Sequence, residues 1–210
     1  MKTYSIVCAI VLAAMMFSGC SGGKEEKAEE KAAADTAQTA VVVEKIIVDD
    51  FNTGTKPNKL GGDLGAWDKD PKDETQTCIM TYDSAVKNGD SGYSVRLDYD
   101  VESPNPAYNG FWMKLENLNA AGYKNLVLFV RGDAEKGFTQ KFKVELKSAK
   151  ETGSYIVTGV NEAWQKIVIP LEKFVGLTDR SALTEMVIVF DDTNSTEKFG
   201  SINIDDIYFE

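Results

Sequence analysis

Short runs in which hydrophobic and polar residues alternate dominate the chain from about residue 44 to its end. The clearest is QKFKVELK, in which Phe142, Val144 and Leu146 alternate with charged residues. A two-residue period is typical of a strand with one face in the core and the other in water. The segments 125–130 and 186–190 are apolar at consecutive positions instead, and they predict strands in the middle of sheets.

Ten such runs follow one another, separated by segments rich in Gly, Asn, Asp and Pro. They cover residues 44–51, 76–83, 92–100, 110–118, 123–133, 140–147, 153–160, 163–171, 184–192 and 200–210. Only 171–176 and 179–184 predict a helical turn, and no longer amphipathic helix is expected between strands. The pattern therefore predicts an all-β fold, an antiparallel two-sheet β-sandwich, in a single domain spanning 44–210. The hydrophilic stretch 52–74 predicts a long loop that Trp67 anchors.

The first 43 residues have a different character. Lys2, the apolar stretch 6–16 and the small residues before Cys20 predict a signal peptide over residues 1–19. The stretch MMFSGC resembles a bacterial lipobox, which implies a lipoprotein cleaved before Cys20 and acylated on that residue. By the same resemblance, Ser21 favours the outer membrane if the host is Gram-negative. Residues 20–43 are rich in Ala, Glu and Lys, and they predict a flexible charged tether, so we expect contact with the membrane through lipid only.

Composition narrows the possible chemistry. The 210 residues include no histidine, which excludes Ser-His-Asp catalysis and histidine-ligated metal sites. The 33 acidic residues outnumber the 23 basic ones, for a formal charge of −10, and this argues against a nucleic-acid partner. With Cys8 in the signal peptide and Cys20 lipidated, Cys78 has no partner for an intrachain disulfide and is expected to be a small buried hydrophobe.

Four motifs occur in an order that resembles a known family. VDDFNT comes first, GFWMKL lies in mid-chain, AWQKIVIPLEKF follows, and FGSINIDDIYF ends the chain. The set is similar to the galactose-binding-like jelly roll of family 11 carbohydrate-binding modules and to the complex I intermediate-associated protein 30 domain. The resemblance implies a noncatalytic sandwich that binds glycans on its concave face, commonly with structural calcium.

Acidic residues in the first and last motifs are candidates for a calcium site. Asp205 shares a strand face with Ile207 and Phe209, so its carboxylate should point into an apolar environment and need a partner. By resemblance, Asp205 best matches the metal-binding aspartate of the family, whereas Asp50 and Asn52 match less well. Asn52 stands where the family often has Glu. Strand-end capping and a solvated acidic rim remain the alternative.

Aromatic residues near mid-chain are candidates for sugar binding, because a sugar ring stacks its apolar face on an aromatic side chain. Strand periodicity places Trp112 on the polar face, whereas alignment with the family places Phe111 at the stacking position, and a shift of one residue exchanges the faces. The remaining ligand-binding candidates are Tyr108, Tyr155, Arg96 and Asp98. Lys143 and Glu145 are expected on the same polar face as Arg96 and Asp98.

The leading hypothesis is a noncatalytic, monomeric carbohydrate-binding lipoprotein of the cell envelope that holds an oligosaccharide or polysaccharide. The alternative is a structural or assembly adaptor that binds a protein through the same concave face. An exposed aromatic row would favour sugar, and a flat charged face would favour the adaptor. A glycosidase needs only two carboxylates, but a lone sandwich with one long loop argues against an enzyme.

Overall fold

Residues 44–210 are described by the structure, a computed structural model. The expected signal peptide, the lipid site at Cys20 and the tether lie outside the described residues. Within 44–210, no helix is long and apolar enough to cross a membrane.

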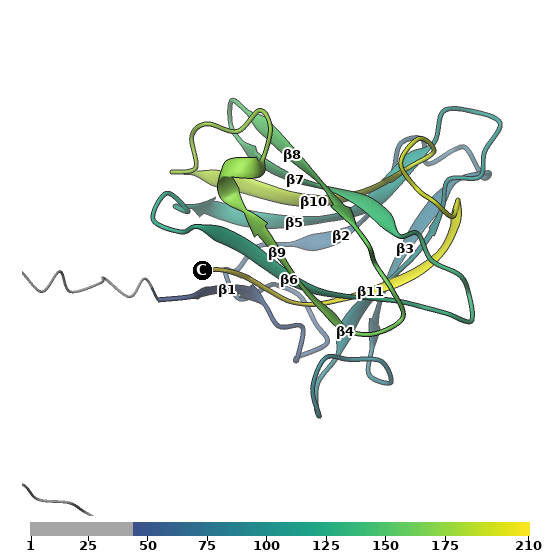
Figure 1. Ribbon diagram of the computed structural model, residues 1–210, viewed down its shortest axis with the longest axis horizontal. Helices are drawn as coiled ribbons and strands as arrows, with labels where there is room; N and C mark the ends of the chain where they lie inside the picture. Colours follow the sequence, from purple (N-terminus) through teal and green to yellow (C-terminus); the bar gives the residue numbers. More distant parts are fainter. Residues whose placement is uncertain (1–43) are drawn as a thin grey trace, which may run out of the picture. The chain divides into compact units, whose positions relative to one another are not determined.

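Eleven strands make up the described domain (Figure 1). They are β1 (Ile46–Asp49), β2 (Leu64–Asp68), β3 (Thr77–Asp83), β4 (Ser94–Asp100), β5 (Tyr108–Leu118), β6 (Asn125–Gly132), β7 (Lys141–Ser148), β8 (Thr152–Thr158), β9 (Gln165–Pro170), β10 (Leu183–Asp191) and β11 (Phe199–Phe209). A single 3₁₀ turn, η1 (Leu171–Lys173), lies between β9 and β10 in this part of the chain.

The strands pair into two antiparallel sheets. One has the order β3-β4-β11-β6-β9 with β1 also on β11, and the other has the order β2-β5-β10-β7-β8. Figure 1 shows the first as the lower layer and the second as the upper layer. The predicted all-β sandwich is confirmed. The first and last strands are neighbours, with Ile46 opposite Phe209.

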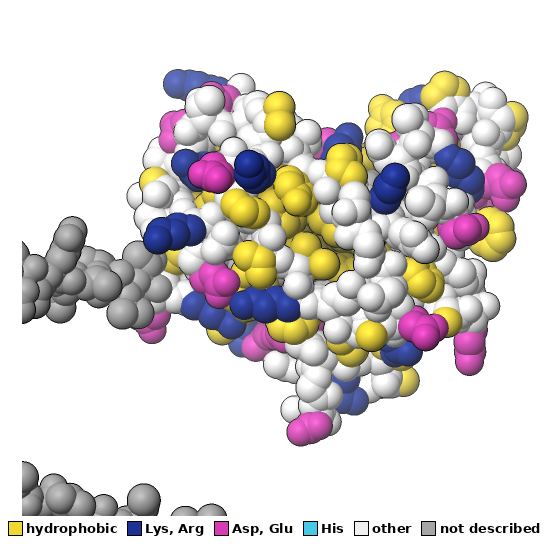
Figure 2. Space-filling view, in the orientation of Figure 1, with side chains coloured by type: hydrophobic (Ala, Val, Ile, Leu, Met, Phe, Trp, Pro, Cys, Tyr) yellow, Lys and Arg dark blue, Asp and Glu magenta, His cyan; other side chains and the backbone are white. Residues whose placement is uncertain are grey.

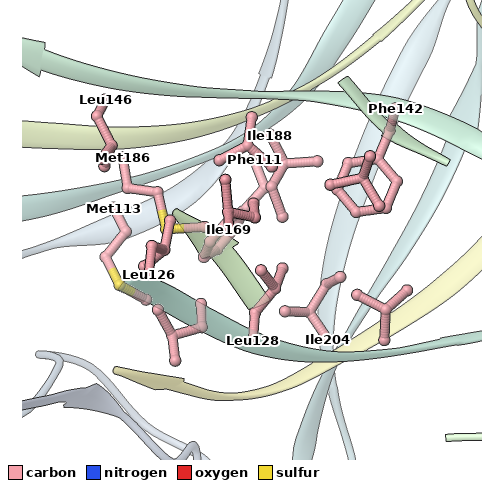
Figure 3. Packing of buried hydrophobic residues seen from close by; sticks show 14 of the residues in the cluster. Phe111, Met113, Leu126, Leu128, Phe142, Leu146, Ile169, Met186, Ile188 and Ile204 are labelled. Carbon is pink, nitrogen blue, oxygen red and sulfur yellow. The ribbon is translucent and has the colours of Figure 1, made fainter. Parts of the chain in front are cut away.

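The core fills the space between the two sheets. Side chains such as Phe111 and Ile188 of the second sheet point toward Leu128 and Ile204 of the first (Figure 3). All four are fully buried. The alternation seen in the sequence thus has a direct cause, because every second residue of each strand packs in this one layer.

Two local expectations were wrong. The stretch 52–74 is not all loop, because β2 pairs along β5 with Leu64 opposite Met113 and Asp68 opposite Asn109. This non-local pairing overrides the weak strand propensity of a Gly- and Asp-rich segment. The segment 179–184 forms no helical turn: the carboxylate of Asp179 accepts hydrogen bonds from Ser181, and β10 begins at Leu183.

Candidate ligand-binding groove

A groove of about 850 Å³ lies on the outer face of the second sheet. It is lined by Trp67, Tyr108, Trp112, Lys114, Lys143, Glu145, Lys147, Glu185, Val187, Val189, Asp191, Asp192, Thr193 and Asn194. Its side chains come from β2, β5, β10 and β7 and from the loop after β10. We call this feature the groove. Since nine of the fourteen side chains are polar or charged and three are aromatic, it combines stacking surfaces with hydrogen-bonding groups.

Strand register arranges the lining in rows across the sheet. In one row, Glu185 of β10 lies between Lys114 and Lys147. In the next, Val187 lies between Trp112 and Glu145.

The row after that places Val189 between Gly110 and Lys143, with Trp67 opposite Gly110. The last row pairs Asp191 with Tyr108. One side of the groove is therefore aromatic, its floor is aliphatic, and its other side is ionic.

Three aromatic side chains form the first side of the groove. Trp67 and Tyr108 pack with ring centroids 5.8 Å apart at 60°. The indole of Trp112 lies over Gly65, since a Cβ built there would be 3.4 Å from the ring. Trp112 and Trp67 are half-buried and Tyr108 is exposed, so all three leave ring surface available in the groove.

Five alternating charges run across the groove from β5 through β10 to β7, and we call them the ion network: Lys114, Glu185, Lys147, Glu145 and Lys143. Glu185 accepts hydrogen bonds from both Lys114 and Lys147, the latter at 3.0 Å. Glu145 lies 3.0 Å from Lys143 and 4.0 Å from Lys147. Burial raises the pKa of Glu185, but the hydrogen bonds from Lys114 and Lys147 lower it further, so its pKa lies below the ordinary value. Glu185 is therefore ionised at neutral pH.

The charge of the domain is not gathered into a single patch on the face drawn in Figure 2. There, hydrophobic side chains lie toward the middle, and basic and acidic side chains are spread around them. At one end of the groove, the carboxylate of Asp191 accepts hydrogen bonds from the backbone N–H groups of Thr193 and Asn194. That carboxylate holds the loop after β10 in place.

The structure brings two of the six expected ligand residues into the groove, namely Trp112 and Tyr108. Phe111 and Tyr155 face the core instead. Phe111 is fully buried, and Tyr155 lies opposite the buried Val144 and packs on Phe174. Of the two candidates for the stacking residue, strand periodicity predicted Trp112, which faces outward, whereas the alignment with the family predicted Phe111, which is buried.

Arg96 and Asp98 do not line the groove, so their expected place beside Trp112 was wrong. Both lie on β4, in the other sheet, where Asp98 contacts Arg96 and Lys136 at 3.1 Å each. The reason is that alternation assigns a residue to a face of its own strand but does not assign the strand to a sheet.

Several groove residues were missed from the sequence. Trp67 was expected to anchor a loop, yet it faces the groove from β2. Val187 and Val189 belong to a run that is apolar on both faces, so they gave no sign that one face floors a groove. Lys114 could have been predicted, because it lies two residues after Trp112 and the same periodicity places both on one face of the strand.

The candidate metal residues lie where β1 meets β11. Asp205 is 2% exposed, and its carboxylate accepts hydrogen bonds from the backbone N–H groups of Asn88 and Asp206. Burial raises its pKa to about 7 against the effect of these bonds. Asp50 instead pairs with Lys59 at 2.8 Å.

The donors at this position have the chemistry that calcium prefers, since it binds carboxylate and amide oxygens. Oδ2 of the neighbouring Asp49 is buried without a hydrogen-bond partner. Asn52 is exposed in the turn that follows β1. No cluster of three or more acidic or cysteine side chains with metal-binding geometry occurs in residues 44–210, so an ion here would need backbone oxygens or water as further ligands.

Comparison with known proteins identifies the fold. No family model matches the sequence, and no curated protein matches it either. Among solved structures, the family 11 carbohydrate-binding module of Clostridium thermocellum, in complex with a β-1,3-1,4-mixed-linked tetrasaccharide, is 16% identical with a TM-score of 0.58. The match covers 79% of this chain and 94% of that one.

Two further modules are similar. The family 28 module, specific for non-crystalline cellulose, is 14% identical with a TM-score of 0.51, over 80% of this chain and 96% of that one. A family 27 module of Caldicellulosiruptor saccharolyticus, in complex with mannohexaose, is 15% identical with a TM-score of 0.50, over 80% and 97%. Residues 44–210 thus have the same jelly-roll β-sandwich fold as these modules.

Proposed function

We propose that this domain binds an oligosaccharide or polysaccharide in the groove and does not cleave it. The supporting observation is the pairing of three aromatic side chains, Trp67, Tyr108 and Trp112, with the ion network across an aliphatic floor. Stacking on an aromatic ring covers the apolar face of a pyranose, while charged groups hydrogen-bond to its hydroxyls. The three similar modules support the same conclusion, because two are in complex with an oligosaccharide and the third is described as specific for cellulose.

A protein-binding adaptor is the weaker candidate. A flat charged face would favour it, but the second sheet presents a groove with an aromatic side.

A glycan array tests the proposal directly. Residues 44–210 should bind at least one glycan, and Trp112→Ala should weaken that binding by about 10-fold or more, since loss of a stacking surface commonly costs more than 1 kcal/mol. Phe199→Ala is the matched control, because Phe199 is an aromatic residue of β11 that is 55% exposed outside the groove. An array without hits, or equal losses in both variants, contradicts the proposal.

We also propose that the domain is lipid-anchored in the cell envelope through Cys20. The sequence MMFSGC supports this, together with the charged residues 20–43, which would separate the domain from the membrane. Labelling with a fatty-acid analogue should modify the full chain but not Cys20→Ala. Fractionation should place it in the outer membrane of a Gram-negative host.

Structural calcium is the third part of the proposal, with Asp205, Asp50 and Asn52 as ligands. The buried carboxylate of Asp205 supports it, because a bound cation would relieve the cost of burying that charge. A chelator should lower the melting temperature, and Asp205→Asn should abolish this effect. A melting temperature that calcium and chelator leave unchanged contradicts this part alone.

A further inference from the structure

Charges in the groove are unevenly distributed, and this bears on which glycan fits. The ion network holds three lysines against two glutamates, a balance of 3 − 2 = +1. Glu185 and Glu145 are each shared by two lysines. Each ammonium has three N–H donors, so hydrogen-bonding capacity remains on the lysine side after these pairs are formed.

The groove also contains two aspartates, but they lie at its other end. Asp191 is six residues along β10 from Glu185, which is about 20 Å at about 3.3 Å per residue. Charges at that distance are largely screened, because the Debye length is about 8 Å at physiological ionic strength. Both carboxylates are also engaged locally, that of Asp191 by Asn194 and that of Asp192 by the backbone of Ala107. The end of the groove at Lys114 is therefore locally positive.

A stacking surface and an ammonium group lie side by side at this positive end, and this ammonium, that of Lys114, is also paired with Glu185. Nζ of Lys114 is 5.4 Å from the centre of the Trp112 ring. A pyranose stacked on the indole would place its ring substituents at the edge of the ring, next to that ammonium. A carboxylate on that sugar would contact Lys114 first. Lys147 lies in the same row of the sheet, on the other side of Glu185 from Lys114.

From this juxtaposition we propose that the groove binds an acidic polysaccharide, with a uronic-acid residue stacked on Trp112 and its carboxylate paired with Lys114 and Lys147. The inference rests on the proposed glycan binding and narrows it to one chemical class. The net charge of −10 makes the whole chain repel polyanions. A preference for acidic sugars must then arise locally in the groove.

Pairs of polymers that differ only in charge test this inference on the full chain in detergent. Suitable probes are polygalacturonate, alginate and polyglucuronate, each beside its carboxyl-reduced neutral form. Titration calorimetry should show at least one acidic form binding about 10-fold more tightly than its reduced partner, as expected for one charge-assisted contact. The preference should fall when NaCl is raised from about 0.05 M to about 0.5 M.

Three variants separate the charge effect from the stacking effect. Lys114→Gln should lower the ratio of acidic to neutral affinity by about 10-fold. Glu185→Gln should raise that ratio, because it removes the carboxylate that competes for Lys114 and Lys147. Lys136→Gln is the matched control: it removes the same charge from a lysine that pairs with Asp98 on the other sheet, and the ratio should not change. Circular dichroism confirms that each variant is folded.

The outcomes distinguish this inference from the proposed function. Binding to neutral glycans that equals or exceeds binding to the acidic forms overturns the acidic class and leaves the glycan-binding function standing. A preference that Lys114→Gln and Lys136→Gln lower equally also overturns it. If neither these probes nor the glycan array shows binding, both proposals fail.

Discussion

At the scale of single residues, the groove depends on side chains that hold its wall in position. Asn58, which is 3% exposed, lies in the segment before β2. Its amide nitrogen donates to the carbonyl of Lys114 at 2.8 Å, and its Oδ1 accepts from the N–H groups of Leu60 and Gly62. Gly62 is required beside it, since a Cβ there would be 2.4 Å from the carbonyl oxygen of Lys114. This segment therefore supports the backbone that carries Lys114.

Asn58→Ala should lower the free energy of unfolding by about 2–4 kcal/mol, because it breaks three hydrogen bonds and leaves buried partners unpaired. Urea denaturation followed by tryptophan fluorescence measures the change. The control is Asn119→Ala, which removes one exposed acceptor, the Oδ1 that binds the backbone N–H of Ala121, and should cost about 0.5 kcal/mol or less. Equal losses in the two variants would show that Asn58 does not support the groove wall.

At the scale of strands, β10 holds the groove together, because it lies between β5 and β7 and carries Glu185, which pairs with Lys114 on one neighbour and Lys147 on the other. The pKa of Glu185 is lowered by its lysine partners below the ordinary value of 4.5. A group with a depressed pKa in the folded state stabilises the fold above its unfolded pKa, and this contribution is lost as the pH falls through the folded value.

Glu185→Gln should therefore destabilise the protein at pH 7 by about 1 kcal/mol, a modest figure because both lysines are partly exposed. The difference from the wild type should shrink below pH 4.5 and vanish once the wild-type carboxyl is protonated. Thermal unfolding of both proteins between pH 7 and pH 3 measures it. A constant difference across this range would mean that packing, and not charge, explains the loss.

The sequence predicts the features of these strands that depend on residues within one strand, but not those that depend on pairing with a distant strand. The pattern of apolar positions identified ten of the eleven strands and the outward side of Trp112, because the burial of every second residue is a property of one strand. It could not place Arg96 and Asp98 in the correct sheet, nor find β2, because both depend on partners distant in sequence. The groove was hidden for the same reason, since four strands supply its lining.

At the scale of the whole domain, the first and last strands of the described chain pair with each other. β1 pairs with the end of β11, and Val48 of β1 is fully buried in the core between the sheets. Both sheets share this one core, so the domain should unfold in a single cooperative transition. Stability of the groove, which lies on the other sheet, is thereby tied to a four-residue strand.

Removing β1 should therefore weaken the entire domain. A chain of residues 51–210 should lose about 3–5 kcal/mol relative to 44–210, because Val48 leaves the core and the pairing with Ile207 and Phe209 is lost. Denaturation in urea should show an earlier midpoint but still one transition, whether far-UV circular dichroism or tryptophan fluorescence is followed. Val48→Ala in the longer chain isolates the packing contribution and should cost about 1–3 kcal/mol. If the shorter chain matched the longer one in stability, β1 would be an addition to a sandwich that closes without it.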